Sequence, residues 1–238
     1  MPSLPAVVLT RESADNQPLK EILVAQGITV IECPCVETSI NAYDGAVLQH
    51  GLQVEDFAAV VFTSRRGVLG MAKVAERLGR NGQRLAAVGP ATARELQKAT
   101  GVAVDLVPNP HTGEALARLL VPQLGPGEKV LWVRGNKSSG TFQTVLQGAG
   151  VQWVELVVYT NLPTDVPPLE LPVGAAIVFA SPSAVRRYFK ANRGHLWDTQ
   201  AVAIGTTTRN ALLAAGHEQV VVCKSTDVEH LAETIVNL

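Results

Sequence analysis

Small polar turns recur along this sequence, each after a short run of apolar residues. They combine Ser, Thr and Gly with single Arg or Lys residues: Thr10-Arg11, Thr63-Ser64, Gly89 with Thr92, Arg134-Gly135 with Lys137, Ser181 with Ser183, and Gly205 with Thr207-Thr208. The hydroxyl and backbone N–H groups of such turns cap helices and hydrogen-bond to anions. Arg and Lys side chains add local positive charge. We therefore predict that these residues bind a large polyanionic ligand.

The turns occur twice because the sequence itself is duplicated. Three segments of the first half align with three of the second, in the same order: Leu9–Arg11 with Trp132–Arg134, Val60–Ser64 with Ile177–Ser181, and Ala87–Thr92 with Ala203–Thr208. The aligned segments lie about 120 residues apart in each case. This spacing is too long for a solenoid repeat and indicates a duplicated unit of domain size.

Apolar, β-branched runs alternate with amphipathic stretches in both halves, and this alternation predicts the elements that position the turns. We expect strands at 6–10, 29–33, 58–63, 85–88, 102–107, 130–133, 152–158, 175–180, 200–204 and 219–223. We expect helices at 18–26, 67–78, 91–100, 114–124, 140–148, 183–192, 207–215 and 228–236. Strict alternation predicts an α/β fold with parallel sheets, in which ligands lie beyond the carboxyl ends of the strands.

Two stretches fit neither pattern and read as linkers, at about 37–56 and 161–174. They cut the chain into four pieces, and two assemblies are possible. In a tandem assembly each repeat forms its own domain. In an exchanged assembly the middle block, about 40–160, forms one domain and the two chain ends form the other. Periodicity alone leaves both assemblies open.

Composition excludes several classes of protein. The 238 residues are 47% hydrophobic with a formal net charge of −1, so we expect no nucleic-acid partner and no membrane association. No secretion signal or long apolar run is present, and we expect a cytoplasmic protein. Dinucleotide, phosphate-loop and metal-ligand motifs are missing from the sequence, so we expect no cofactor and no metal. Cys33, Cys35 and Cys223 read as reduced, buried filler.

Seven short motifs in order carry a family resemblance. They are VLTR from Val8, VVFTS from Val60, AVGPATA from Ala87, LWVRG from Leu131, Tyr159-Thr160, IVFASPSAV from Ile177 and AIGTTT from Ala203. With this order and spacing, essentially the whole chain resembles uroporphyrinogen-III synthase.

The resemblance implies two flavodoxin-like domains in the exchanged assembly, 1–38 with 170–238 and 42–160, joined by the two linkers. It also implies that a cleft between them holds hydroxymethylbilane, which is closed to uroporphyrinogen III with loss of water and inversion of the last ring. Tyr159 is implied as the catalytic acid. We also expect the protein to be a monomer that needs no cofactor. We expect it to receive hydroxymethylbilane by transient hand-off from hydroxymethylbilane synthase. The alternative is a two-lobed protein that binds or senses a small anion without turnover.

Overall fold

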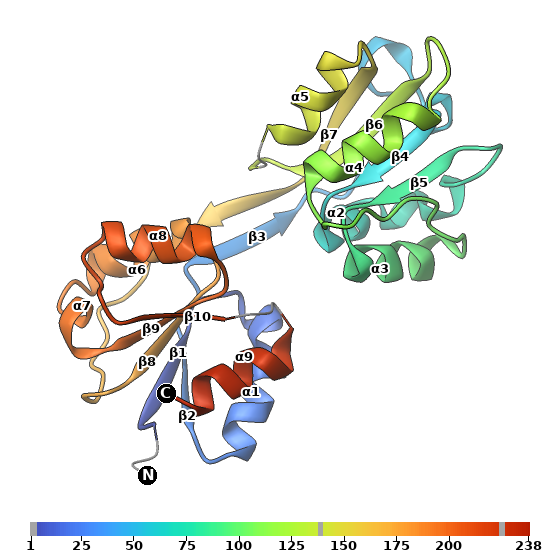
Figure 1. Cartoon of the computed structure of the whole chain (residues 1–238). Helices are drawn as coiled ribbons and strands as arrows, with labels where there is room; N and C mark the ends of the chain where they lie inside the picture. The colour runs from blue at the N-terminus through green and yellow to red at the C-terminus, as the bar shows by residue number, and fades with distance from the viewer. Residues whose placement is uncertain (1–3, 138–139, 224–226) are drawn as a thin grey trace. The chain divides into compact units, whose positions relative to one another are not determined.

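The computed structural model describes residues 4–137, 140–223 and 227–238. The chain divides into two compact units. Unit 1 comprises Met1–Glu37 and Leu162–Leu238, and unit 2 comprises Thr38–Asn161. Each unit is a five-stranded sheet with helices on both faces (Figure 1). The α/β fold predicted from the alternating pattern is confirmed.

Unit 1 has the strand order β10-β9-β8-β1-β2, with every pair parallel. Its strands are β1 (Ala6–Leu9), β2 (Thr29–Glu32), β8 (Ala176–Phe179), β9 (Gln200–Ala203) and β10 (Val220–Val222). Its helices are α1 (Ser13–Ala25), α6 (Pro182–Ala191), α7 (His195–Asp198), α8 (Thr206–Ala214) and α9 (Val228–Val236). Counted along the unit, this is the 2-1-3-4-5 order of a flavodoxin-like sheet.

Unit 2 has the order β3-β7-β6-β4-β5, in which β7, β6, β4 and β5 are parallel. Its strands are β3 (Val36–Ile40), β4 (Ala59–Phe62), β5 (Arg84–Ala87), β6 (Lys129–Gly135) and β7 (Gln152–Pro163). Its helices are α2 (Arg65–Gly70), α3 (Pro90–Thr100), α4 (Gly113–Leu120) and α5 (Thr141–Gly148), with short 3-10 turns η1 (Gln49–Gly51), η2 (Val54–Asp56), η3 (Ala72–Arg77) and η4 (Val121–Gln123).

Strand pairing decides between the two assemblies that the sequence left open. β1 belongs to the first repeat and pairs with β8 of the second, Val8 opposite Ile177. β4 belongs to the first repeat and pairs with β6 of the second, Val61 opposite Trp132. Each sheet therefore combines strands of both repeats, which is the exchanged assembly that the family resemblance implied.

Both sheets are buried on both faces, and alternate strand residues face opposite helix layers. In unit 1, Val7 packs with residues of α1 and α9, whereas Val8 packs with residues of α6 and α8. In unit 2, Val60 packs with residues of α2 and α3, whereas Val61 packs with residues of α4 and α5. The helix pairs on the two sides of each sheet can be followed in Figure 1.

The predicted strand at 102–107 is reduced to a single bridge between Ala86 and Leu106. The carboxylate of Asp105 accepts the backbone N–H of Leu85 at 2.7 Å, so a side chain takes the place of a strand-to-strand bond there. Pro108, just beyond, has no N–H to extend the ladder. Val102, Val104 and Leu106 are half-buried and alternate with exposed residues. The backbone hydrogen bonds to β5 are confined to Asp105 and Leu106, so the segment is too short to form a strand.

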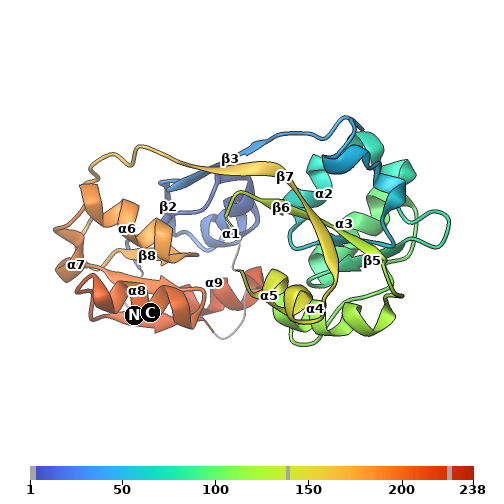
Figure 2. The same cartoon turned by 90° about the horizontal axis from the view of Figure 1, so that it is seen from above.

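The stretches expected as linkers contain more structure than their proline content suggests. β3 and β7 are neighbours in the sheet order, and the chain passes between the units within these two strands (Figure 2). After β3, Tyr43 and Val54 are buried in the core of unit 2. After β7, Leu169 and Leu171 pack against the core of unit 1. Scattered apolar residues in both stretches thus contact a core without showing a regular period.

Candidate functional site

Three strands of unit 2, β4, β5 and β6, end at one pocket of about 220 Å³, and β7 passes beside it. Thr63 follows β4, Val88 follows β5, Lys137 follows β6, and Tyr159 lies in β7. Gly113, Trp132 and Phe142 complete the lining. The pocket therefore lies at the carboxyl ends of parallel strands, where α/β sheets bind ligands. It brings together three of the residues predicted from sequence, Thr63, Lys137 and Tyr159.

Tyr159 is held in this pocket by its neighbours and is only 8% exposed. The register of β6 and β7 shifts between Arg134 and Gly135, so that Gly135 instead of a larger residue lies opposite Tyr159. The hydroxyl of Ser64 donates a hydrogen bond to the phenol oxygen at 2.9 Å. The Ser64 oxygen in turn accepts the backbone N–H of Gly67 at 3.1 Å, which caps α2.

An aromatic wall that sequence reasoning missed lines the same pocket. The rings of Trp132 and Phe142 lie 4.9 Å apart, and the indole N–H of Trp132 donates to the Thr63 hydroxyl oxygen at 3.4 Å. Both aromatic residues are 1% exposed. Trp132 lies in an apolar run and Phe142 on an amphipathic stretch, and both patterns are typical of core residues. The only available signal was that an indole placed next to a strand end needs a partner for its N–H.

The two cationic residues at the end of β6 have different surroundings. The Arg134 guanidinium donates to the Glu155 carboxylate at 2.5 Å and lies 4.7 Å from the Trp132 ring centroid. Its charge is thus already compensated within unit 2. Lys137 is exposed, lines the pocket, and has no ion-pair partner in the part of the chain that the structure describes. Lys137 is therefore the cation available to an anionic ligand here.

Gly89 and Thr92 lie at the start of α3, beside the pocket residue Val88. Gly89 is the N-cap, and the His111 ring packs against it, since a methyl group at Gly89 would lie 3.5 Å from the imidazole. The Nδ1 atom of His111 is 2.7 Å from the Pro108 carbonyl oxygen. The Thr92 side chain is 6% exposed and has no hydrogen-bond partner among the described residues. Its hydroxyl is not consumed by helix capping.

In unit 1, the predicted residues after β1 are already engaged. The Thr10 hydroxyl donates to the Val178 carbonyl at 2.7 Å and is 1% exposed, so it ties β1 to β8. Arg11 forms an ion pair with Asp15 at 3.4 Å. Glu32, at the end of β2, is 2.6 Å from the Lys20 ammonium, whose hydrogen bond lowers the pKa of that carboxyl. A charged carboxylate at this strand end disfavours an anionic ligand.

The turns after β8 and β9 present helix N-termini. Ser181 caps α6 by accepting the N–H of Ala184, and its hydroxyl lies 3.0 Å from that of Ser183. Gly205 is the N-cap of α8, and Thr207 is exposed in its first turn. Thr208 is 4% exposed and, like Thr92, has no partner for its hydroxyl within the described ranges. The duplicated threonines therefore share an unused hydroxyl in both units.

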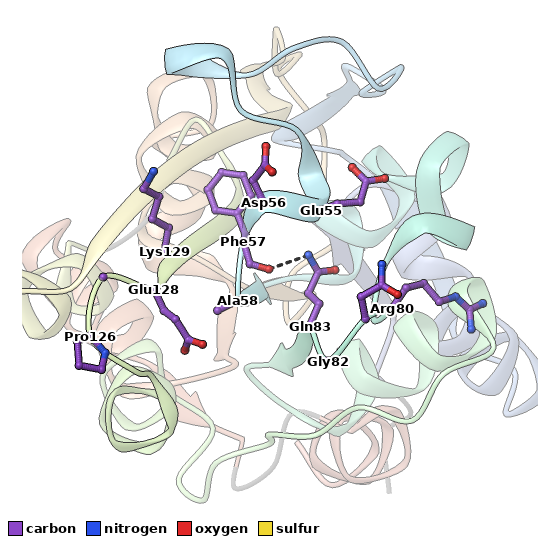
Figure 3. A pocket seen from close by; sticks show the side chains of 12 residues that line it. Glu55, Asp56, Phe57, Ala58, Arg80, Gly82, Gln83, Pro126, Glu128 and Lys129 are labelled. Carbon is purple, nitrogen blue, oxygen red and sulfur yellow. Dashed lines mark hydrogen bonds between the residues drawn. The ribbon is translucent and has the colours of Figure 1, made fainter.

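A larger pocket, of about 470 Å³, lies at the opposite end of the unit 2 sheet (Figure 3). Its labelled residues lie just before the first residues of β4 and β5 and around the first residue of β6. The Gln83 amide donates to the Phe57 carbonyl at 3.0 Å. Glu55, Asp56 and Glu128 contribute carboxylates that already bind Arg77, the Gln53 N–H and the Gly125 N–H. Three carboxylates in its lining make this a poor site for a polyanion, so the smaller pocket is the better candidate.

Neither a metal cluster nor a membrane-spanning helix is found among the described residues. Cys33, Cys35 and Cys223 are buried and form no disulfide bond among the described residues, in agreement with the sequence prediction of small buried side chains. The pKa of Cys35 is raised by its hydrogen bond with the Cys33 thiol and by burial. Such a thiol is a poor nucleophile at neutral pH.

The sequence model of the HemD uroporphyrinogen-III synthases matches residues 17–233, which is most of the chain. The chain belongs to the uroporphyrinogen-III synthase family. A curated uroporphyrinogen-III synthase of Chlorobaculum parvum is 31% identical over 228 residues, covering 88% of this chain and 89% of that protein. The resemblance stated from seven short motifs is thereby confirmed.

Solved uroporphyrinogen-III synthase structures share the fold. The enzyme of Helicobacter pylori matches with a TM-score of 0.66 at 18% identity, over 98% of this chain and 99% of that one. A mutant of the Thermus thermophilus enzyme matches with a TM-score of 0.58 at 18% identity, over 96% and 97%. Both are uroporphyrinogen-III synthases, and none of these relatives supports the alternative of an anion-binding or sensing protein.

Proposed function

We propose that this protein is a cyclising lyase that converts hydroxymethylbilane to uroporphyrinogen III, with Tyr159 as the acid. The observation that carries the proposal is the position of the phenol. Tyr159 lies in β7 opposite the carboxyl end of β6, in a pocket with aromatic walls and the cation Lys137, which has no ion-pair partner among the described residues. A pyrrole ring with an acidic substituent has the same combination of a flat apolar face and a negative charge.

The acid step needs one proton and no electron carrier. The phenol O–H donates its proton to the departing hydroxyl group. The C–O bond breaks with both electrons going to oxygen, water leaves, and the pyrrole nitrogens stabilise the cation left on the bilane. The substituted α-carbon of the last pyrrole ring attacks this cation. Its old bond to the neighbouring methylene bridge then breaks and leaves a cation on that methylene, stabilised by the preceding pyrrole. The free α-carbon of the last ring bonds to this methylene, so that the macrocycle closes with the ring inverted. The proton that this ring loses on regaining its aromaticity restores the phenol.

Binding of the substrate requires many weak contacts to carboxylates. In unit 2, Lys137, the Thr92 hydroxyl and the N-terminus of α3 are available. In unit 1, Thr207, Thr208 and the N-terminus of α8 are available. Backbone N–H groups at helix N-termini stabilise anions without a large net charge, which agrees with the near-neutral composition of the chain. Thr10, Arg11 and Arg134, engaged within their own units, contribute to the shape of these turns.

Four further points belong to the same proposal. We expect no cofactor, because the reaction redistributes electrons within the bilane itself. We expect the domains 1–38 with 170–238 and 42–160 to act as one monomer in the cytoplasm. We expect the bilane to arrive by transient hand-off from hydroxymethylbilane synthase, since the free bilane closes spontaneously. We expect the crossing strands to let the two domains close on the substrate.

A coupled assay tests the proposal. Porphobilinogen and a bilane-forming deaminase are incubated with and without this protein, and the oxidised porphyrin isomers are separated by chromatography. Uncatalysed closure gives the type I isomer, so the expected result is a shift to type III that grows with the concentration of this protein. Type I alone, from protein whose folding is confirmed by circular dichroism, would refute the proposed activity.

A further inference from the structure

Two residues that the sequence assigned to substrate binding contact Tyr159 instead. The Ser64 hydroxyl donates to the phenol oxygen at 2.9 Å. Gly135 lies directly against the aromatic ring, since a methyl group built there would be 2.2 Å from Cε2 and 2.4 Å from Cζ of Tyr159. Both contacts lie within unit 2. They fix the position of the phenol from its oxygen and from one side of its ring.

We propose that Ser64 and Gly135 are positioning residues that set Tyr159 as a proton donor toward the pocket. Ser64 fixes the direction of the hydrogen bond, and Gly135 fixes the plane of the ring. Neither residue needs to touch the substrate for this role. The inference rests on the proposed acid role of Tyr159 and adds the device that orients it.

The chain of donors explains the direction. The Gly67 N–H donates to the Ser64 oxygen, and the Ser64 O–H donates to the phenol oxygen. The phenol oxygen is thus occupied as an acceptor, and its own hydrogen remains free to donate to a ligand in the pocket. The same hydrogen bond stabilises the negative charge that forms on this oxygen when the proton leaves. Ser64 therefore favours both the ground-state orientation and the proton transfer.

The close approach at Gly135 explains why glycine is needed there. Its backbone has no positive φ, so conformational freedom is not the reason for glycine at this position. The register shift next to Arg134 brings Tyr159 opposite it, and the ring occupies the space of a side chain. The next residue after Gly135 also pairs with β7, because the Asn136 N–H donates to the Tyr159 carbonyl at 3.1 Å. Any side chain at 135 must displace the phenol from Ser64.

A double-mutant cycle with Ser64→Ala and Tyr159→Phe tests the role of Ser64. We expect Y159F to lower kcat about 10- to 100-fold, which is at or below the lower limit of the range for a general acid, about 100- to 10,000-fold. We expect S64A to lower kcat about five- to tenfold with little change in KM, the effect of one hydrogen bond. In the Y159F background the S64A change should fall below about twofold, because the oxygen that Ser64 serves is gone. Ser64→Thr, which keeps both the cap and the donor, should restore kcat.

Controls separate this role from a structural one. S64A also removes the cap of α2, so Asp227→Ala, which removes the cap of α9 in unit 1, serves as the matched loss of a cap. D227A should lower stability and leave kcat unchanged. If S64A lowers kcat equally with and without the Tyr159 hydroxyl, or leaves wild-type kcat unchanged, the positioning role of Ser64 is overturned. Absence of type III isomer from the wild type would instead overturn the proposed activity itself.

Gly135 and the bond from Ser64 are also checked without turnover. Protein labelled with 3-fluorotyrosine contains three tyrosines, Tyr43, Tyr159 and Tyr188, and Y159F assigns the resonance of Tyr159. S64A and G135A should each shift that fluorine resonance and leave those of Tyr43 and Tyr188 in place. G135A should lower kcat about as much as Y159F. An unshifted Tyr159 resonance in both variants would contradict the inference even if kcat fell.

Discussion

Replacing Gly70 by Ala should destabilise unit 2, although Ala favours helix. Gly70 ends α2, and a methyl group there would lie 2.4 Å from Val158 Cγ2 and 3.0 Å from the Val158 carbonyl oxygen. Carbon atoms pack best at about 3.5–4.0 Å, so α2 and β7 must separate by about 1 Å. Overpacking of this kind costs about 1–3 kcal/mol.

Two backbone bonds depend on the same contact. The Tyr43 N–H donates to the Gly70 carbonyl and the Asn41 N–H donates to the Val158 carbonyl, both at 2.8 Å. Weakening one of them adds about 1 kcal/mol, and the better helix propensity of Ala returns about 1 kcal/mol. We therefore expect G70A to lower the free energy of unfolding of unit 2 by about 2 kcal/mol.

The assay must report on unit 2 alone, because a protein of two units need not unfold in one step. The tryptophans are Trp132, Trp153 and Trp197, and only Trp197 lies in unit 1. In a Trp197→Phe background, fluorescence during urea unfolding therefore follows unit 2. Gly148→Ala is the matched control, since no atom lies within 4 Å of its added methyl group, and it should stabilise by about 0.5–1 kcal/mol. Equal midpoints for G70A and its parent would refute the overpacking argument.

Three further changes probe the ligand contacts and the core of unit 1. Lys137→Gln should raise KM about three- to tenfold, and this increase should shrink at high salt. Arg134→Gln should change KM little and lower the free energy of unfolding by about 1–2 kcal/mol, because it removes the contacts with Glu155 and Trp132. Equal effects of the two changes on KM would contradict the assignment of Lys137 as the cation that binds the ligand. Thr92→Val and Thr208→Val should raise KM without lowering the melting temperature, because neither hydroxyl has a partner among the described residues; a lower melting temperature at unchanged KM would mean a structural role. Burial lowers the pKa of His217 from its ordinary 6.5, so the unfolded chain takes up a proton first as the pH falls, and the free energy of unfolding of unit 1 should decrease below about pH 6.5. Burial lowers the pKa of His195 as well, so both histidines contribute to this pH dependence. In urea titrations at several pH values, His217→Gln should make the free energy of unfolding less dependent on pH, and an unchanged pH dependence would exclude His217 as a cause.

The strands and their turns were predictable from the sequence, but the pairing of the strands was not. Four-residue apolar runs such as Ala59–Phe62 and Ala176–Phe179 are buried on both faces and carry a strong local signal. The two repeats carry nearly the same signal, so a strand such as β1 has equivalent candidates for a neighbour in both halves. Only packing in three dimensions, with β1 beside β8, removes this degeneracy.

The site was predictable as a set of residue types and not as a set of partners. Thr10 and Arg134 have the chemistry of ligand contacts, yet Val178 and Glu155 occupy them. The register shift beside Gly135 depends on how β6 and β7 pair, so it cannot be predicted from the sequence of either strand alone. The role of Trp132 in the pocket was not predictable either. Its position in an apolar strand predicts a buried ring, but it does not show that the indole N–H lies next to Thr63 of the neighbouring strand end.

The exchanged pairing also sets an order of events on the ribosome. Unit 2 is one continuous stretch, Thr38–Asn161, and its whole sheet except the last two residues of β7 has been synthesised by the time residue 161 emerges. β1 and β2 are synthesised before unit 2, but β1 must wait for β8, more than a hundred residues later, to cover its second edge. β1 is therefore synthesised before unit 2 but covered after it, and an apolar edge strand left open for that time is a natural client for a chaperone.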